Sequence, residues 1–293
     1  MFDEILFPTD GSDGAAAALD HVLELAERHE STVHVINVAD TTRDSLTHIS
    51  GEVVDALEER GEDIVQQAAD RVRNRRLEVV TEILQGEPNQ TIVEYADSRE
   101  IDLIILPTHG RRGLKRYLLG STTERVVRRS NVPVLTLRPA AAKDSQYPYE
   151  DVLVPTDGSA GANEALSIGV DVTLAEEALL HLLSVITTTS LGVDVRSDIM
   201  KRELEASAEH ILEEAAEFAT DAGVESPRES VEYGASIHKV ILSYIDDHDI
   251  DLVVVGTHGR TGLERYMIGS VTDYLIRTAP IPVLTVRRRE DRR

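Results

Sequence analysis

The chain alternates short apolar runs with longer stretches in which apolar residues recur every three or four positions, and this alternation occurs twice. The apolar runs, rich in Val, Ile and Leu, predict strands, and the periodic stretches predict helices. In the first half the predicted strands are 4–7, 32–38, 77–84, 101–106 and 134–137, and the predicted helices are 13–29, 47–75, 89–99 and 116–130. In the second half strands are predicted near 151–154, 178–186, 229–233, 251–255 and 283–286.

This order of elements predicts the fold. Regular strand–helix alternation is typical of a parallel sheet that is covered by helices on both faces and connected by right-handed crossovers. Two of the strands lack polar alternation, as expected for strands buried on both faces. The predicted fold class is α/β, with two tandem doubly wound, Rossmann-like domains of five parallel strands in the order 3-2-1-4-5. The expected domains are 1–140 and 149–289, because residues 139–149 lose all periodicity.

Two motifs recur in the two halves. Pro-Thr-His-Gly at 107–110 is followed by nine residues and Gly-Ser at 120–121, and Gly-Thr-His-Gly at 256–259 is followed by nine residues and Gly-Ser at 269–270. Upstream, Pro-Thr-Asp-Gly-Ser occurs at 8–12 and again at 155–159. The aspartates are 157 − 10 = 147 residues apart and the motif glycines 259 − 110 = 149. The chain is therefore a duplicated domain that gained about two residues between the motifs.

The predicted strand order brings these motifs together. In a doubly wound sheet, ligands bind beyond the carboxyl ends of the strands where the winding direction reverses, here between the first and fourth strands. The first strand ends at Asp10 or Asp157, and the fourth strand ends at the start of the glycine motif. The two motifs are expected to face each other across one crevice in each domain.

The glycine motif suits a phosphate group. Glycine allows close approach of a backbone and positive φ angles, and the N–H groups of a following helix attract an anion. Ser270 and Thr272, with Ser121 and Thr123 in the first copy, are expected to place hydroxyl donors on that turn. Basic residues also gather there in an otherwise acidic chain: Arg260 and Arg265, and Arg111, Arg112, Lys115 and Arg116 in the first copy. A glycine-rich strand–helix turn flanked by surface bases is the alternative.

Asp10 and Asp157 suit contact with ribose hydroxyls or an adenine amino group. The following serines, Ser12 and Ser159, are the natural helix N-caps, which leaves the aspartates for a ligand. His109 and His258 are interpreted as hydrogen-bonding loop residues, because no nucleophile accompanies either one. The sequence contains no nucleophile elbow, Walker loop or His-x-x-His pair, so no catalytic or metal residue is assigned.

The composition restricts the expected cellular location and partners of the protein. Cysteine is absent, no segment is long and apolar enough to span a bilayer, and the acidic start does not resemble a signal peptide. A cytoplasmic protein is expected. The formal net charge of −23 disfavours nucleic acids and anionic membranes as partners. Only 4 of the 30 bases are lysine, and such acid-rich, lysine-poor chains are typical of extreme halophiles, where salt screens self-repulsion. An ordinary acidic protein is the alternative.

The chain resembles the universal stress protein family in its tandem two-domain form. Gly256-x2-Gly259-x9-Gly269-Ser270 fits the ATP-binding pattern of that family, and the strand-ending Pro-Thr-Asp and the Val-Pro-Val-Leu at 132–135 are also similar to it. The resemblance implies that the aspartate holds adenosine, that a valine after the second strand lines the adenine pocket, and that the glycine loop holds the phosphates. It implies ATP, or AMP or ADP, as cofactor, with Mg2+ or Mn2+. It also implies pairing of the two domains and a homodimer of chains.

The candidate cofactor-binding residues follow from the motifs and the resemblance together. They are Asp157, Val185, Gly256, His258, Gly259, Gly262, Gly269, Ser270, Val271 and Thr272 in the second copy, and Asp10, Val38, Gly110, Gly113, Gly120, Ser121, Thr122 and Thr123 in the first.

The first copy departs from the family pattern at Pro107, which stands where the first motif glycine belongs. Proline removes a backbone donor and adds a ring beside the crevice, so the two copies are expected to be unequal. The leading hypothesis is an adenine-nucleotide-binding stress-response protein that acts through nucleotide-dependent interactions or assembly, and not an enzyme. The alternatives are a slow ATPase or nucleotidyl-transfer enzyme and an interaction protein without a nucleotide.

Overall fold

The structure is a computed structural model that describes residues 1–40, 52–109, 119–138, 147–188, 195–257 and 268–287, with the backbone alone for 52–58 and 195–199. The chain divides into two compact units, Met1–Tyr147 and Pro148–Arg293. Each unit is described by itself.

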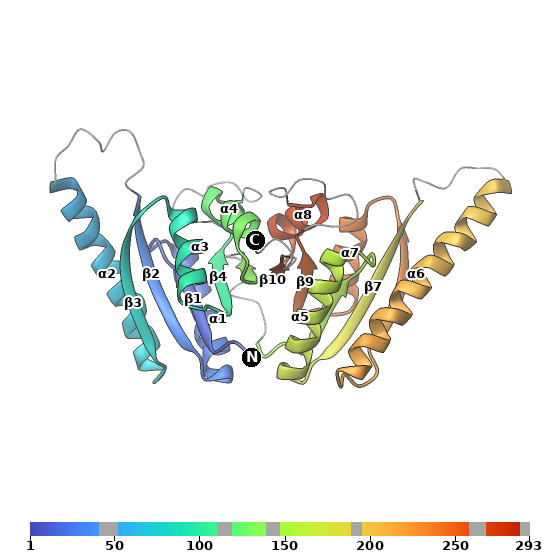
Figure 1. Cartoon of the computed structure of the whole chain (residues 1–293), viewed down its shortest axis with the longest axis horizontal. Coiled ribbons are helices and arrows are strands. Elements are labelled where there is room, and N and C mark those ends of the chain that lie inside the picture. Colours follow the sequence, from blue (N-terminus) through green and yellow to red (C-terminus); the bar gives the residue numbers. More distant parts are fainter. Residues whose placement is uncertain (41–51, 110–118, 139–146, 189–194, 258–267, 288–293) are drawn as a thin grey trace. The chain divides into compact units, whose positions relative to one another are not determined.

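Unit 1 alternates strands and helices (Figure 1). Its elements are β1 (Glu4–Pro8), α1 (Asp13–His29), β2 (Thr32–Asp40), α2 (Glu52–Asn74), β3 (Val79–Gly86), α3 (Pro88–Ser98), β4 (Leu103–Pro107), α4 (Ser121–Arg129) and β5 (Val134–Leu137).

Unit 2 repeats this order. Its elements are β6 (Asp151–Pro155), α5 (Ala160–Glu176), β7 (Leu179–Thr187), α6 (Val195–Asp221), β8 (Arg228–Gly234), α7 (Ile237–Asp247), β9 (Leu252–Gly256), α8 (Ser270–Thr278) and β10 (Val283–Val286).

The predicted strand order is confirmed in both units. The strands of unit 1 run β3-β2-β1-β4-β5, those of unit 2 run β8-β7-β6-β9-β10, and their pairing is parallel. In each unit the first two helices pack on one face of the sheet and the last two on the other (Figure 1), as right-handed crossovers require. The central strands β1, β4, β6 and β9 are almost entirely buried.

The motif after the first strand folds into the same turn in both units. Gly11 and Gly158 take φ angles of 71° and 73°, which lie in the left-handed region that glycine adopts without strain. Ser12 Oγ accepts a hydrogen bond from the N–H of Ala15 at 3.2 Å and so caps α1, as predicted. Ser159 caps α5 in the same way. The motif therefore turns the chain from strand to helix within a few residues.

Of the helix expected at 116–130, residues 116–118 lie outside the described residues, and the described part begins later than predicted. Residues 119 and 120 are not helical, and α4 starts at Ser121 with Gly120 as its N-cap. Gly120 N–H donates to the Thr108 carbonyl at 2.8 Å, and Gly269 N–H donates to the Thr257 carbonyl at the same distance in unit 2. These bonds tie the helix start to the end of the fourth strand, so the glycine is the N-cap of the helix and does not interrupt it.

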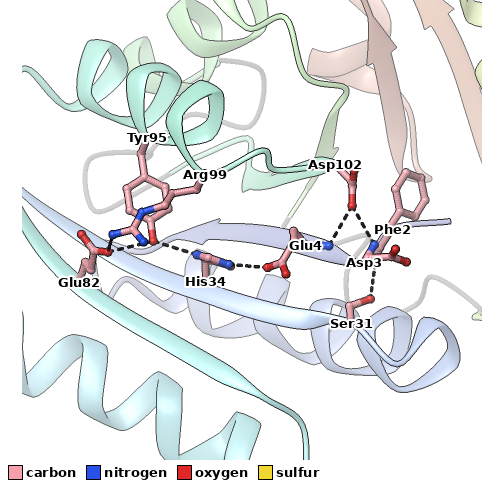
Figure 2. A network of polar contacts seen from close by, with 9 residues as sticks. All are labelled: Phe2, Asp3, Glu4, Ser31, His34, Glu82, Tyr95, Arg99 and Asp102. Carbon is pink, nitrogen blue, oxygen red and sulfur yellow. Dashed lines mark hydrogen bonds and ion pairs between the residues drawn. The ribbon is translucent and has the colours of Figure 1, made fainter.

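A polar network joins the elements of unit 1 at the amino ends of its strands (Figure 2). His34, on β2, places Nε2 2.6 Å from a Glu4 carboxylate oxygen and Nδ1 2.8 Å from the Tyr95 hydroxyl on α3. Tyr95 lies close to Glu82, and burial together with that carboxylate raises the pKa of Tyr95 to about 12. The network connects two strands to the helix that covers them.

Unit 2 contains the corresponding network. His181, on β7, places Nε2 2.8 Å from an Asp151 carboxylate oxygen and Nδ1 3.1 Å from the Tyr244 hydroxyl. The Asp251 carboxylate accepts hydrogen bonds from the N–H groups of Glu150 and Asp151 at 2.8 and 3.0 Å, as Asp102 does for Asp3 and Glu4 (Figure 2). The duplication thus extends to a network that the sequence motifs did not mark.

Candidate functional site

A cavity of about 480 Å³ lies at the carboxyl ends of the strands of unit 2. One part of its wall is polar and consists of residues of the turn after β6 and the start of α8: Thr156, Asp157, Ser159, Gly269, Ser270 and Thr272. The rest is mainly apolar and comes largely from β7, α6 and α7, with residues such as Val185, Leu204, Ala208, Ile211, Ile237 and Ile241. Ligand cavities in proteins commonly have this volume and this mixture of apolar walls with a few polar groups.

The structure brings the described candidate residues of unit 2 around this one cavity. They are Asp157, Val185, Gly256, Gly269, Ser270, Val271 and Thr272. Asp157 follows β6 and Gly256 ends β9, and β6 and β9 are hydrogen-bonded neighbours between which the strand order reverses. The cavity therefore occupies the switch point to which the strand order had assigned the ligand.

Some candidates lie outside the described residues. They are His258, Gly259 and Gly262 in unit 2 and Gly110 and Gly113 in unit 1. The basic residues that follow the two glycine motifs also lie outside: Arg260, Arg265, Arg111, Arg112, Lys115 and Arg116.

Asp157 is held in position by its own turn. One of its carboxylate oxygens accepts a hydrogen bond from the N–H of Ser159 at 3.0 Å, and the Asp10 carboxylate binds Ser12 N–H in the same way in unit 1. The prediction that capping by serine leaves the aspartates entirely to a ligand is therefore wrong in part, because one carboxylate oxygen fixes the turn. This hydrogen bond orients the carboxylate of Asp157, which lines the cavity.

The first turn of α8 borders the cavity. Gly269 is its N-cap, and no side chain caps the helix, so the N–H groups of residues 270–272 have no acceptor within the helix. Ser270 and Val271 are part of the cavity wall. This end of a helix, with its partial positive charge, favours an anionic group.

The hydroxyls of Thr272 and Thr123, which were expected to donate to a phosphate, donate to backbone carbonyls in this structure. Thr272 Oγ1 donates to the Gly256 carbonyl at 2.7 Å, and Thr123 Oγ1 donates to the Pro107 carbonyl at 2.9 Å. A hydroxyl has a single proton, and here it fastens the helix to the end of the fourth strand. Of the hydroxyls proposed in unit 2, Ser270 is the one left for this role.

Gly256 is required by packing against α5. A Cβ at this position would lie 2.4 Å from the carbonyl oxygen of Gly161 and 3.3 Å from the N atom of Ala162, both in the first turn of α5. In the sequence this glycine is the first of the pattern that the family resemblance assigns to ATP binding. The structure shows that it makes room for the backbone of a helix whose residues Ser159 and Ala162 border the cavity.

In unit 1 the corresponding candidates take corresponding positions. Asp10 follows β1, Val38 lies on β2, Gly120 caps α4, and Ser121, Thr122 and Thr123 form its first turn. Pro107 ends β4 and is buried. The two units therefore share a scaffold and differ at the residue that ends the fourth strand.

Apart from Val185, the apolar wall was not predicted from the sequence. Leu204, Ala208 and Ile211 come from α6, and Ile237 and Ile241 from α7. Their spacing of three or four residues is the usual one for a helix face that covers a sheet. That signal cannot distinguish an apolar residue that lines a cavity from one that packs in the core.

Two histidines of the described residues make contacts within the fold. His109 Nδ1 lies 2.9 Å from Thr108 Oγ1, which fits the interpretation of His109 as a loop residue. His238 stacks on the Tyr274 ring with centroids 3.8 Å apart, which joins α7 to α8. Among the residues that the structure describes, no group of three or more His, Cys, Asp or Glu side chains could hold a metal ion. No helix in the described part of the chain is long and apolar enough to cross a membrane.

Two doubly wound α/β units, with a ligand-sized cavity beside a helix N-terminus in the second, define a tandem Rossmann-like protein. The family model of the universal stress proteins matches residues 1–138 and again 148–287. The chain belongs to the universal stress protein family, with two family domains in tandem.

Relatives agree with this assignment. A universal stress protein of Methanocaldococcus jannaschii is 32% identical over 141 residues, which is 47% of this chain and 83% of that protein. A universal stress protein of Mycobacterium tuberculosis is 28% identical over 302 residues and aligns along both chains, covering 97% and 96% of them. Among solved structures, a universal stress protein of Archaeoglobus fulgidus superposes with a TM-score of 0.72 at 22% identity, over 98% of this chain and 99% of that one.

Proposed function

We propose that this protein binds an adenine nucleotide, ATP or its products AMP and ADP, in the cavity of unit 2, and acts in the cytoplasm in stress response through nucleotide-dependent interactions. The observation that carries the proposal is the arrangement of the cavity. It has a carboxylate at one strand end, a helix N-terminus at the neighbouring strand end and an apolar wall beside them.

Each part of the cavity suits one part of the nucleotide. The Asp157 carboxylate can accept hydrogen bonds from ribose hydroxyls or from the adenine amino group. The first turn of α8 suits the phosphates. The aliphatic side chains of β7, α6 and α7 suit the flat, weakly polar base, with Val185 in the position that the family resemblance gives to the adenine pocket. A Mg2+ or Mn2+ ion would be held chiefly by the phosphates, since Mg2+ sites commonly combine few protein ligands with substrate phosphates.

The direct test is to identify the small molecules that leave the purified protein on denaturation. Mass spectrometry is expected to find an adenine nucleotide, and calorimetric titration of the emptied protein with ATP is expected to show saturable binding. Protein that carries no adenine and shows neither heat nor thermal shift with ATP would refute the proposal.

We expect about one nucleotide per chain. Pro107 lacks the N–H of the glycine at the equivalent position in unit 2 and adds a ring at the end of β4. The stoichiometry of the titration decides this point, because two equal sites per chain would show that Pro107 is compatible with binding.

We propose a binding protein and not an enzyme. Seven of the described residues that line the cavity carry hydroxyls, and none of them has a hydrogen bond to a histidine: Thr156, Ser159, Ser184, Thr187, Ser207, Ser270 and Thr272. ATP is therefore expected to hydrolyse no faster in the presence of the protein than in buffer alone. Hydrolysis that disappears in the His258→Ala variant would establish the enzymatic alternative.

We also propose that the acidic surface is an adaptation to high salt. With a net charge of −23, self-repulsion weakens as the screening length falls from about 10 Å at 0.1 M to about 3 Å at 1 M salt. The melting temperature is expected to rise by several degrees when KCl is increased over this range. Replacing Glu203, Glu209 and Glu213 on the exposed face of α6 with glutamine should reduce the rise. A melting temperature that is constant or falls would contradict this proposal.

Pairing of the two domains and a homodimer of chains remain predictions of the family resemblance. The chain has a mass of 32.3 kDa. Light scattering with and without ATP is expected to give twice this mass, and a monomer in both conditions would contradict the dimer.

A further inference from the structure

Helix α5 of unit 2 lies unusually close to its sheet, at two places along its length. At its first turn, a Cβ on Gly256 would lie 2.4 Å from the Gly161 carbonyl oxygen. Eight residues further along the helix, a Cβ on Gly169 would lie 2.4 Å from Val154 Cγ2 and 3.8 Å from Val254 Cβ. These two contacts are roughly 12 Å apart along the helix axis, so together they fix both the height and the tilt of α5 over β6 and β9.

Unit 1 positions its corresponding helix with side chains where unit 2 has glycines. The offset of 147 residues relates Gly169 to Val22 (169 − 147 = 22), and the offset of 149 relates Gly256 to Pro107 (256 − 149 = 107). Val22 is fully buried and Pro107 is buried as well. Glycine in the middle of a helix is unfavourable, and unit 1 shows that the fold does not require it at this position.

The close packing matters for the cavity because α5 and the turn before it form part of the cavity wall. Asp157, Ser159 and Ala162 come from this segment, and Val255 and Gly256 come from the strand beneath it. If α5 moved away from the sheet, Asp157, Ser159 and Ala162 would move relative to the start of α8. The start of α8 would stay in place, because Thr272 ties it to β9.

We propose that Gly169 is a positioning residue for the cavity of unit 2, although it is not part of the cavity wall. Because Gly169 has no side chain, α5 can pack directly on Val154. In this position α5 holds the Asp157 turn at the distance from α8 that lets one nucleotide contact both. The proposal rests on the proposed function, because it concerns the affinity of that same site.

The test is the variant Gly169→Ala and its rescue. The new Cβ must move from 2.4 Å to at least the 3.4 Å of ordinary contact with Val154, so α5 shifts outward by up to about an ångström. We expect the dissociation constant for ATP to increase about tenfold. The second substitution Val154→Ala removes the atom that the Cβ meets, and the double variant is expected to bind ATP within about twofold of the original protein.

Measurements of stability distinguish a loss of positioning from a general loss of structure. Val154 is fully buried, so its truncation leaves a cavity and lowers the melting temperature. The single variant Val154→Ala is therefore expected to be less stable than the original protein and yet to bind ATP nearly as well. Asp171→Ala on the exposed side of the same helix is the matched control, and its affinity should stay within about twofold.

Three results distinguish the possible failures. If Gly169→Ala binds ATP as the original protein does, Val154 adapts and the positioning role is wrong. If the double variant does not regain affinity, the contact with Val154 is not the cause and the inference is again wrong.

A crystal structure of Gly169→Ala tests the shift of α5 without any nucleotide. If α5 is shifted there but the original protein does not bind ATP, the helix placement stands and the proposed function fails.

Discussion

Replacing Asp157 with asparagine is expected to weaken ATP binding by roughly 10- to 100-fold. Hydrogen bonds to a charged group contribute about 1.5–3 kcal/mol, and each 1.4 kcal/mol corresponds to about tenfold in affinity. Asparagine keeps the oxygen that accepts from Ser159 N–H at 3.0 Å, so the turn is preserved and the charge alone is removed. Calorimetric titration with ATP measures the change.

Asp10→Asn is the matched control, because Asp10 holds the same turn in unit 1 through the same hydrogen bond to Ser12 N–H. Its effect on the site in unit 2 should be less than about twofold. Unchanged affinity in Asp157→Asn would exclude contact between this carboxylate and the nucleotide. A loss confined to Asp10→Asn would place the site in unit 1.

The sequence predicted the scaffold well because parallel buried strands carry a strong local signal. Runs such as 134–137 and 283–286 have the predicted bounds, and the recurring motifs placed the ligand region at the switch point. Prediction was weaker at helix starts. Helical periodicity continues through 116–120, but the hydrogen bond from Gly120 N–H to the Thr108 carbonyl fixes the start of α4 at Ser121.

The roles of individual motif residues were harder to predict, because they depend on partners that are distant in the sequence. Thr272 has the residue type of a phosphate ligand, yet its proton goes to the Gly256 carbonyl, 16 residues away. Gly256 belongs to a phosphate-binding pattern, yet its nearest neighbour is the backbone of Gly161. A motif specifies the site as a whole, and the tertiary contacts decide what each of its members does.

Replacing Asp151 with alanine is expected to destabilise unit 2 by about 1–3 kcal/mol, the usual cost of leaving a buried polar group without its partner. A carboxylate only accepts hydrogen bonds, so His181 donates through Nε2 to Asp151 and accepts at Nδ1 from Tyr244. The His181 side chain is 0% exposed. Once the carboxylate is removed, Nε2 loses its acceptor in a place that water does not reach.

Glu4→Ala provides the comparison in unit 1 and should cost less. The Glu4 side chain is 38% exposed against 26% for Asp151, and His34 keeps 7% exposure, so water can replace the lost carboxylate more easily. Hydrogen exchange followed by mass spectrometry resolves the two units. Asp151→Ala should lower protection in β6 and β7, and Glu4→Ala should lower it to a smaller extent in β1 and β2. Equal losses in the two units would contradict the argument from burial.

The pH dependence of the stability provides a second test of the Asp151→Ala prediction. Burial lowers the pKa of His181 below its ordinary value of 6.5, and the hydrogen bond that His181 donates to Asp151 opposes this shift. With the pKa lower in the folded state, the unfolded chain binds the proton more readily, so the stability present above pH 6.5 is lost as the pH falls toward the folded-state pKa. Without Asp151 the folded-state pKa falls further and the loss extends to lower pH. The destabilisation by Asp151→Ala should therefore grow between pH 7.5 and about pH 5.5. If it shrank instead, His181 would be protonated in the folded protein, and its contact with Asp151 would be an ion pair.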